Sequence, residues 1–213
     1  FERLAYASAK CAIEHSCIDV SQEKVCFILS STKGAIETLT SQVDESNQTD
    51  DSNLGTSAQK IANGLGISTS PIVVCNACIS GLSALILASR LLEQGKYEYA
   101  VVCGADCPDR FIISGFQSLK ALSTEPCRPF DMERFGLNLG EAAATIVLAK
   151  NAPCMDEAQA KKGKLWQIGA GFIKNDAFHI SAPSKTSEGL YAALQETLQY
   201  VTKDELALVN AHG

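Results

Sequence analysis

The sequence predicts an α/β protein in which a mostly parallel, buried sheet packs around a central helix. Two observations predict this fold class: short, continuous apolar runs recur along the chain, and helical patterns separate them. Continuous apolar runs are typical of parallel strands, because helices cover both faces of such a sheet. The 213 residues are enough to bury a sizeable core.

The first elements follow from periodicity and from turn residues. Residues 1–15 are predicted to form a helix, with Phe1 and Leu4 on one side. Residues 25–29 form an apolar run rich in strand formers, which a polar Ser-Ser-Thr-Lys-Gly segment follows. A second helix is predicted over residues 56–64, closed by glycine.

The best helix pattern covers residues 79–94 and directly follows a strand predicted over 72–75. It is apolar on most faces and stops at Gly95, so we expect a buried, central helix. Later in the chain a helix is predicted over 186–201. Strands are predicted over 99–104, 142–148, 166–173 and 206–209, the third of which contains Gly169 and Gly171.

Composition and charge narrow the functional classes. With 46% hydrophobic and 20% charged residues the chain is an ordinary globular protein, and its net charge of −6 argues against nonspecific nucleic-acid binding. No apolar run could span a bilayer and no signal peptide opens the chain, so we expect a soluble, cytoplasmic protein without membrane contact. The nine cysteines are odd in number and irregularly spaced, unlike a secreted disulfide framework.

Cys78 is the main candidate for chemistry. It lies between the strand at 72–75 and the helix at 79–94, in the run Cys-Asn-Ala-Cys-Ile-Ser-Gly. The positive end of the helix dipole favours a thiolate there, and Gly81 leaves room for close approach of a substrate or a second backbone. This arrangement is typical of a nucleophile elbow, with Cys in place of Ser.

Three other interpretations of these cysteines compete with the nucleophile. Cys78 could be a buried structural thiol. Cys75 and Cys78 form a C-x-x-C pair, a spacing that is also typical of a dithiol redox site. We expect Cys75 to belong to the strand, with its side chain in the sheet packing, which argues against that site. A zinc site has less support, because no second Cys/His pair has ligand spacing.

The three histidines differ in their placement. His212 follows the strand at 206–209 and is expected at the carboxyl edge of the sheet, where open α/β folds bind ligands. There it could converge with Cys78 on one cleft. His15 follows Cys11 by four residues, which fits a metal half-site or an ordinary surface histidine. His179 lies in a loop and could be structural or border a site.

Five blocks of the chain carry a resemblance to one family. Residues 76–81 resemble the active-site motif of β-ketoacyl synthases, the condensing enzymes of fatty-acid and polyketide synthesis. Residues 115–123, 127–141, 176–183 and 210–213 resemble further family segments, and the five blocks occur in family order. Asn76 departs from the pattern, since Thr is usual at that position.

The resemblance implies a thiolase-like layered fold, represented by a truncated piece. Residues 1–150 would be the N-terminal ketosynthase half without its first strand, and residues 151–213 a linker and the start of the C-terminal half. The family's second catalytic His and its Lys would lie beyond residue 213. We therefore expect the 213-residue chain by itself to be inactive in condensation.

The implied activity is that of a 3-oxoacyl-[acyl-carrier-protein] synthase, an acyltransferase. Cys78 would take an acyl group from a phosphopantetheine thioester, and malonyl-acyl carrier protein would then undergo decarboxylative Claisen condensation. His212 would stabilise the enolate, and Phe116 would border the acyl chain or be a plain core aromatic. The resemblance implies no metal and no tightly held cofactor, since the substrates are carried on the phosphopantetheine of acyl carrier protein.

The implied partners are acyl carrier protein and a second synthase subunit, in a homodimer or a heterodimer. The pairing strand would be the one at 72–75 or the one at 99–104, because such enzymes continue the sheet across a two-fold axis. Two alternatives stay open at this point. They are a noncatalytic partner subunit of a condensing-enzyme heterodimer and the dithiol redox protein.

Overall fold

The computed structural model describes residues 1–16, 18–21, 24–38, 52–151, 165–179 and 184–210. Its contacts divide the chain into two compact units, which are described separately. Unit 1 comprises residues 1–116 and 139–165, and unit 2 comprises residues 117–138 and 166–213. The predicted domain boundary after residue 150 stays a prediction.

Unit 1 contains a four-stranded sheet with the strand order β2-β1-β3-β4. β1 (Val25–Ser30) is parallel to β2 (Ile72–Val74) and to β3 (Tyr99–Asp106), and β4 (Ala142–Ala149) is antiparallel to β3. The α/β fold with a mostly parallel sheet is therefore confirmed. β3 has a partner on both sides, so the prediction that residues 99–104 could pair across a two-fold axis is wrong. β2 lies at an edge of this sheet.

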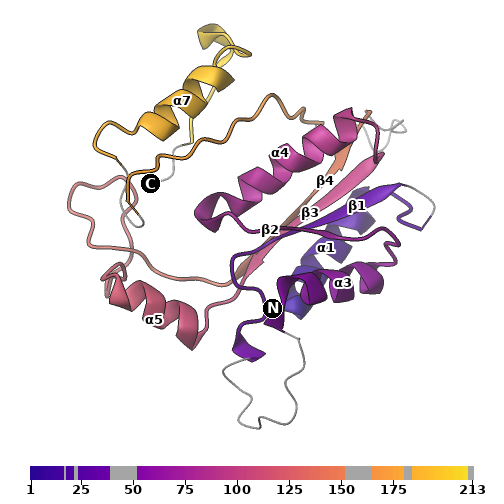
Figure 1. Ribbon diagram of the computed structural model, residues 1–213, viewed down its shortest axis with the longest axis horizontal. Coiled ribbons are helices and arrows are strands. Elements are labelled where there is room, and N and C mark those ends of the chain that lie inside the picture. The colour runs from indigo at the N-terminus through magenta and orange to yellow at the C-terminus, as the bar shows by residue number, and fades with distance from the viewer. Residues whose placement is uncertain (17, 22–23, 39–51, 152–164, 180–183, 211–213) are drawn as a thin grey trace. The chain divides into compact units, whose positions relative to one another are not determined.

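Helices cover both faces of the sheet. α1 (Glu2–Ser16) and α3 (Leu54–Leu65) pack on one face, and α4 (Ser80–Glu93) packs on the other (Figure 1). β1 shows why its sequence is apolar throughout, because all six of its residues are buried. Alternate side chains point to opposite faces of a strand, and here each face meets a helix layer.

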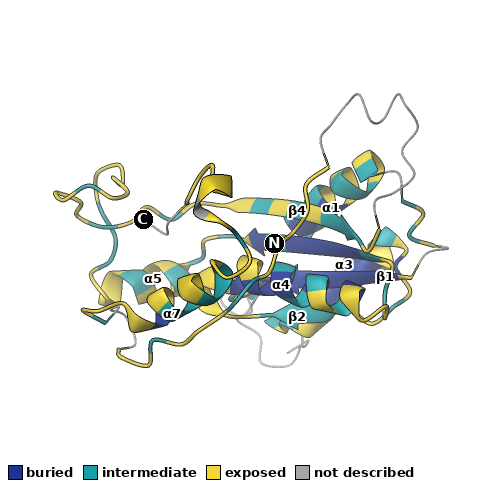
Figure 2. Ribbon diagram, turned by 90° about the horizontal axis from the view of Figure 1, so that it is seen from above, coloured by how far each residue is buried: buried dark blue, intermediate teal, exposed yellow. Residues whose placement is uncertain are grey.

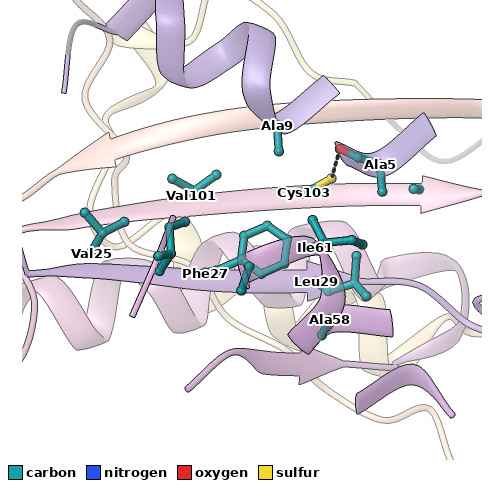
Figure 3. Close-up of a cluster of buried hydrophobic side chains, with 12 residues drawn as sticks. Ala5, Ala9, Val25, Phe27, Leu29, Ala58, Ile61, Val101 and Cys103 are labelled. Carbon is teal, nitrogen blue, oxygen red and sulfur yellow. Dashed lines mark hydrogen bonds between the residues drawn. The ribbon is translucent and has the colours of Figure 1, made fainter. Parts of the chain in front are cut away.

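The alternation along β1 divides the core into two clusters. Phe27 and Leu29 pack with Ala5 and Ala9 of α1 and Ala58 of α3 (Figure 3). The residues that alternate with them along the strand, Cys26 and Ile28, pack with Ala84, Ala88 and Leu92 of α4. Small helix residues at these contacts let each helix lie close to the sheet, where packing reaches the density of protein interiors.

The ends of α3 follow ordinary capping chemistry. The side chain of Asn53 accepts a hydrogen bond from the Gly55 N–H at the first turn. At the other end Gly66 adopts a left-handed conformation with φ +78°, and its N–H donates to carbonyls of the last turn. Glycine adopts this conformation without the steric penalty of a Cβ.

α4 is less buried than the sequence predicts. Its sheet-facing side is buried, whereas Leu82 on the opposite side is 55% exposed. The apolar residues that suggested burial all round therefore form two surfaces, and among the described residues the sheet covers only one of them. The second surface adjoins the elbow that carries Cys78.

Unit 2 has less regular structure than unit 1. It contains α7 (Glu188–Thr197), the short η4 (Lys203–Glu205) and an isolated bridge between Leu122 and Leu137. α7 is shorter than the predicted helix over 186–201. Figure 2 shows α7 largely in the colours of exposed and intermediate residues.

Two predicted strands are wrong in this structure. Residues 166–173 and 206–209 form no strand. Trp166 is 88% exposed and Leu208 is 82% exposed. A strand is stabilised by hydrogen bonds to a neighbouring strand, and no described residue pairs with either segment. Both segments therefore have strand-like sequences, but no described residue provides the neighbouring strand that they need.

Candidate active site

Cys78 lies at the strand-to-helix junction, as predicted. β2 ends at Val74, and residues Ala77–Ile79 form a single 3-10 turn, η3, before α4 begins at Ser80. The turn is sharp, because Ala77 has a positive φ of +45°. A non-glycine residue in this region stores strain, which clusters at functional sites. Cys78 itself is exposed, so the interpretation as a buried structural thiol is wrong.

Two buried serines of α4 hold the elbow in place. The Ser80 hydroxyl accepts a hydrogen bond from the Asn76 backbone N–H at 2.8 Å and donates one to the Ala77 carbonyl at 2.7 Å. The Asn76 side-chain amide donates to the Ser83 hydroxyl at 3.0 Å. These bonds satisfy backbone groups that the tight turn would otherwise leave unpaired. They also fix the peptide on each side of the strained residue.

Cys75 lies differently from the prediction. It is exposed and its thiol donates to the Thr32 carbonyl at 3.6 Å, so its side chain is not part of the sheet packing. Both Cys75 and Cys78 carry free thiols. Since the Cys75 sulfur is directed to the end of β1, the pair differs from a dithiol poised for exchange.

A hydrogen-bond network links the strand ends that support the elbow. Asp106, at the end of β3, accepts hydrogen bonds from the Ser31 hydroxyl at 2.8 Å and from the Thr32 N–H at 3.4 Å. The Ser31 N–H in turn donates to the Val74 carbonyl at 3.3 Å. Ser31 therefore connects the ends of β1, β2 and β3 by hydrogen bonds. The elbow begins at this edge of the sheet.

The buried cysteines are chemically distinct from the exposed ones. Burial raises the pKa of Cys26 to about 11, although the charge of Lys96 opposes the shift. Burial also raises the pKa of Cys103, partly offset by a hydrogen bond with Thr145. The thiolate is the nucleophilic form, so these two residues are poor nucleophiles near neutral pH.

The surroundings of Cys78 are apolar on the solvent side. Ile79 and Leu82 are 39% and 55% exposed. A Cβ added at Gly81 would meet no atom within 4 Å. The close approach of a second backbone, which was one reason to expect glycine at this position, is therefore not made by any described residue. Phe116 is half-buried on α5 (Arg110–Ser118). Its contact with an acyl chain stays a prediction.

The histidines lie in different parts of the chain. His212 is outside the described residues, so its convergence with Cys78 stays a prediction. His15 lies on α1 with its Nδ1 2.7 Å from the Cys11 carbonyl oxygen. His179 is exposed in unit 2. No group of three or more His, Cys, Asp or Glu side chains in the described part of the chain could hold a metal ion.

Asp176 organises the part of unit 2 that precedes α7. Its carboxylate accepts hydrogen bonds from the Ser184 N–H, the Ser184 hydroxyl and the Gly189 N–H. These donors hold the pKa of Asp176 below its usual value. Asp176 therefore joins the segment before α7 to the first turn of that helix, where a negative charge is favourable.

Sequence reasoning missed the residues that support the elbow, namely Ser80, Ser83 and Asp106. The two serines are three residues apart at the start of a helix, a spacing that places side chains on one side. That signal was available, but serine is common at helix starts for capping alone. Asp106 is distant in sequence from the elbow, so only the pairing of the strands brings it near.

Comparison with known proteins places this chain in a family. The family model described as "Beta-ketoacyl synthase, N-terminal domain" matches residues 1–153. The chain belongs to the β-ketoacyl synthase family. Cys78 and Phe116 lie within the matched residues, and His212 lies beyond them. The resemblance inferred from the five sequence blocks is confirmed.

A curated relative and two solved structures illustrate the relationship within the β-ketoacyl synthases. The chain is 36% identical over 151 residues to "3-oxoacyl-[acyl-carrier-protein] synthase 2" of Rhizobium meliloti (strain 1021), covering 66% of this chain and 35% of that protein. It superimposes on a β-ketoacyl synthase from Burkholderia phymatum STM815 with a TM-score of 0.73 and 23% identity, covering 92% of this chain and 53% of the other.

The second structure contains a ketosynthase, ApeO, in complex with its chain length factor, ApeC, from Xenorhabdus doucetiae. The TM-score is 0.70 with 26% identity, over 93% of this chain and 50% of the matched one. This β-ketoacyl synthase chain thus spans about a third of the curated relative's length and about half of the solved chains. Within the described residues, none of its helices is long and apolar enough to cross a membrane.

Proposed function

We propose that this chain carries the acyl-accepting cysteine of a 3-oxoacyl-[acyl-carrier-protein] synthase, and that the whole protein condenses acyl and malonyl thioesters. The observation that carries the proposal is the position of Cys78. It is an exposed thiol on a strained turn, next to the first turn of α4. A family motif surrounds it, and buried serines hold it in place.

The first step is acyl transfer to Cys78. The thiolate attacks the carbonyl carbon of an acyl-phosphopantetheine thioester, a new thioester forms on Cys78, and the phosphopantetheine thiol leaves with a proton. The N-terminal dipole of α4 favours negative charge at this end of the helix. The Cys78 backbone N–H would supply part of the oxyanion hole. Exposed apolar side chains beside the thiol, Ile79 and Leu82, suit an aliphatic acyl chain.

The second step is decarboxylative condensation. Malonyl thioester loses CO2, and the resulting enolate carbon attacks the acyl-Cys78 carbonyl, which releases the thiol and forms the 3-oxoacyl product. His212, donating a hydrogen bond, would stabilise the enolate oxygen. Phe116 would border the acyl chain. These steps need no metal and no tightly held cofactor.

The proposed partners are acyl carrier protein and a second synthase subunit. The carrier would bring both substrates on phosphopantetheine in the cytoplasm. The second subunit would pair along β2, whose three residues lie at the edge of the sheet and adjoin the elbow. An edge strand offers unpaired backbone groups to another chain, and pairing of two copies there would continue both sheets across a two-fold axis.

A noncatalytic partner subunit is the second candidate function, since ApeO is a ketosynthase found with a chain length factor. Such a subunit would lack the nucleophile, so the exposed Cys78 favours the synthase. The dithiol redox function is disfavoured by the contact of Cys75 with the Thr32 carbonyl. A reversible disulfide between Cys75 and Cys78 would be its signature.

The test is transfer of an isotope-labelled acyl group from acyl carrier protein, followed by peptide mass spectrometry. We expect the label on the peptide that carries Cys78 and its loss in Cys78→Ser. Cys75→Ser is the matched control, because it removes the neighbouring exposed thiol and should leave acylation within about twofold of the unchanged chain. Label that persists in Cys78→Ser and moves to Cys75 would disprove the assignment.

A further inference from the structure

A second thiol–histidine pair lies on α1, remote in sequence from the elbow. The Cys11 sulfur is 3.6 Å from Nδ1 of His15, and both side chains are exposed on the last turns of the helix. The spacing of four residues places them on one side of α1. The proposed condensation uses neither residue.

The hydrogen bonds of His15 define the role of its Nδ1 atom. Nδ1 lies 2.7 Å from the Cys11 carbonyl oxygen, and a carbonyl oxygen can only accept. Nδ1 therefore carries a proton, and the Cys11 sulfur lies 3.6 Å from the same nitrogen. A donor next to sulfur stabilises the negative charge that a thiol acquires when it reacts as a nucleophile. Cys11 is thus not a lone surface thiol.

A shallow groove of about 520 Å³, wide open to solvent, adjoins this pair between α1 and β4. Apolar side chains of Leu4, Ala7, Ala12 and Ala143 line much of it, together with Cys11 and His15. The polar part is the pair Ser8 and Thr145, whose hydroxyls bond to each other at 2.8 Å. Because these hydroxyls satisfy each other, the groove can accept an apolar group without leaving them unpaired.

We propose that Cys11 is a modification site for α,β-unsaturated carbonyl compounds that carry an apolar tail. The thiol loses its proton to water, and the thiolate attacks the β-carbon. A sulfur–carbon bond forms, the π electrons of the double bond move to the α-carbon, and that carbon takes a proton from water. The product is a thioether, and no oxidant is needed. The tail lies in the groove between α1 and β4.

The test compares two maleimides that differ only in their tail, N-methylmaleimide and N-hexylmaleimide. Rates at Cys11 are measured in this chain by quenched labelling and peptide mass spectrometry, folded and in urea. The measured quantity is the ratio of the hexyl rate to the methyl rate. We expect this ratio to be about fivefold to tenfold higher in the folded chain than in urea, because part of the tail is buried. A ratio that is the same in the folded chain and in urea would overturn the role of the groove.

Two exposed positions on α1 separate the roles of groove and histidine. Ala7→Phe fills the groove, so the preference for the hexyl reagent should fall to about one while the methyl rate stays within about twofold. His15→Ala removes the N–H donor and should slow both reagents at Cys11 about tenfold. Glu14→Gln, beside His15, is the matched control and should leave both rates within about twofold.

Circular dichroism of each variant establishes that α1 and the sheet are folded before rates are compared. Labelling of Cys11 that is about tenfold slower in His15→Ala than in Glu14→Gln supports the role of the pair. Unchanged reactivity in a folded His15→Ala variant would show that His15 contributes nothing and would overturn the proposal. Acylation of Cys78 is scored separately in the same digests, so failure at one site is distinguishable from failure at the other.

Discussion

The Ser80 hydroxyl lies 2.8 Å from the Asn76 backbone nitrogen and thereby closes the elbow across the strained turn. The same oxygen donates to the Ala77 carbonyl at 2.7 Å. One buried side chain thus pairs two backbone groups on either side of a positive φ. The position of Cys78 depends on this bridge, because the thiol is one residue beyond Ala77 and two before Ser80.

Replacement of Ser80 by Ala should loosen the elbow. The Asn76 N–H loses its partner and the Ala77 carbonyl keeps only the Ser80 backbone N–H, which we expect to cost about 1–3 kcal/mol in the free energy of unfolding. Acyl transfer to Cys78 should slow by about tenfold or more, because a misplaced nucleophile loses its near-attack geometry. Urea titration and the acyl-transfer assay measure the two effects.

Ser89→Ala is the matched control for Ser80→Ala. Ser89 lies on the same helix and its hydroxyl bonds to Glu93 near the surface. This bond should contribute less than about 0.5 kcal/mol, and acylation should not change. Equal effects of the two substitutions would contradict the role of Ser80.

The stability of unit 1 should fall in alkaline solution because of Cys26. Its thiol ionises above about pH 9 in the unfolded chain and keeps its proton until about pH 11 in the folded one. Between these values the unfolded state binds fewer protons, so stability is full below pH 9 and falls as pH rises. The loss from this group should reach about 3 kcal/mol at most.

Urea unfolding between pH 8 and pH 10.5 measures this slope, with Cys26→Ala as the comparison. The variant lacks the thiol, so its stability should fall less steeply over that range although it is less stable at pH 8. Parallel curves for the two proteins would rule out Cys26 as the source. Native Cys26 should also resist thiol reagents at pH 8.

Asp176 should make the first turn of α7 acid-sensitive. Its hydrogen bonds from Ser184 and Gly189 lower its pKa in the folded state. The resulting stability is present above the ordinary pKa of an aspartate and is lost as pH falls through the lowered value. Hydrogen exchange of α7 amides, corrected for intrinsic rates, should show protection at pH 6 that decreases toward pH 3.

Asp176→Asn should remove most of that pH dependence and weaken protection at pH 6. The neutral amide presents a weaker acceptor to the Gly189 N–H than the carboxylate does. Asp204→Asn provides the comparison, since Asp204 is an exposed acid of the same unit outside α7. Protection that is unchanged in Asp176→Asn would contradict this account.

Gly136→Ala should disrupt the segment that joins Leu122 to Leu137. Gly136 has φ +152°, and a Cβ there would lie 2.7 Å from the Ala121 carbonyl oxygen. Because the obstacle is backbone, the bridge must open, at an expected cost of about 2 kcal/mol in local stability. Exchange of the Leu137 N–H, which donates to Ala121, reports the opening.

Gly140→Ala is the corresponding control. A Cβ at Gly140 would meet no atom within 4 Å, so the substitution should leave the Leu137 exchange rate within about twofold. Similar exchange rates in the two variants would show that space at Gly136 is not the determinant.

The sequence by itself determined most elements of unit 1 and the place of Cys78, whereas the helix α5 was not predicted from it. The apolar run over β1 and the strand-to-helix junction before α4 are local patterns, and local patterns are sufficient where packing reinforces them. The strands predicted over 166–173 and 206–209 had similar patterns. They are not strands, because a strand also needs a neighbour, which periodicity within one segment cannot reveal.

Only the tertiary structure decided what supports the nucleophile. Sequence patterns placed Cys78 on a turn, but the bridge from Ser80 and the link from Asp106 to Ser31 depend on strands and helices meeting in space. The same holds for Cys75, which bonds to Thr32 at the end of another strand. Spacing along the chain predicts which side chains share a face, whereas contacts between elements are set by how those faces pack together.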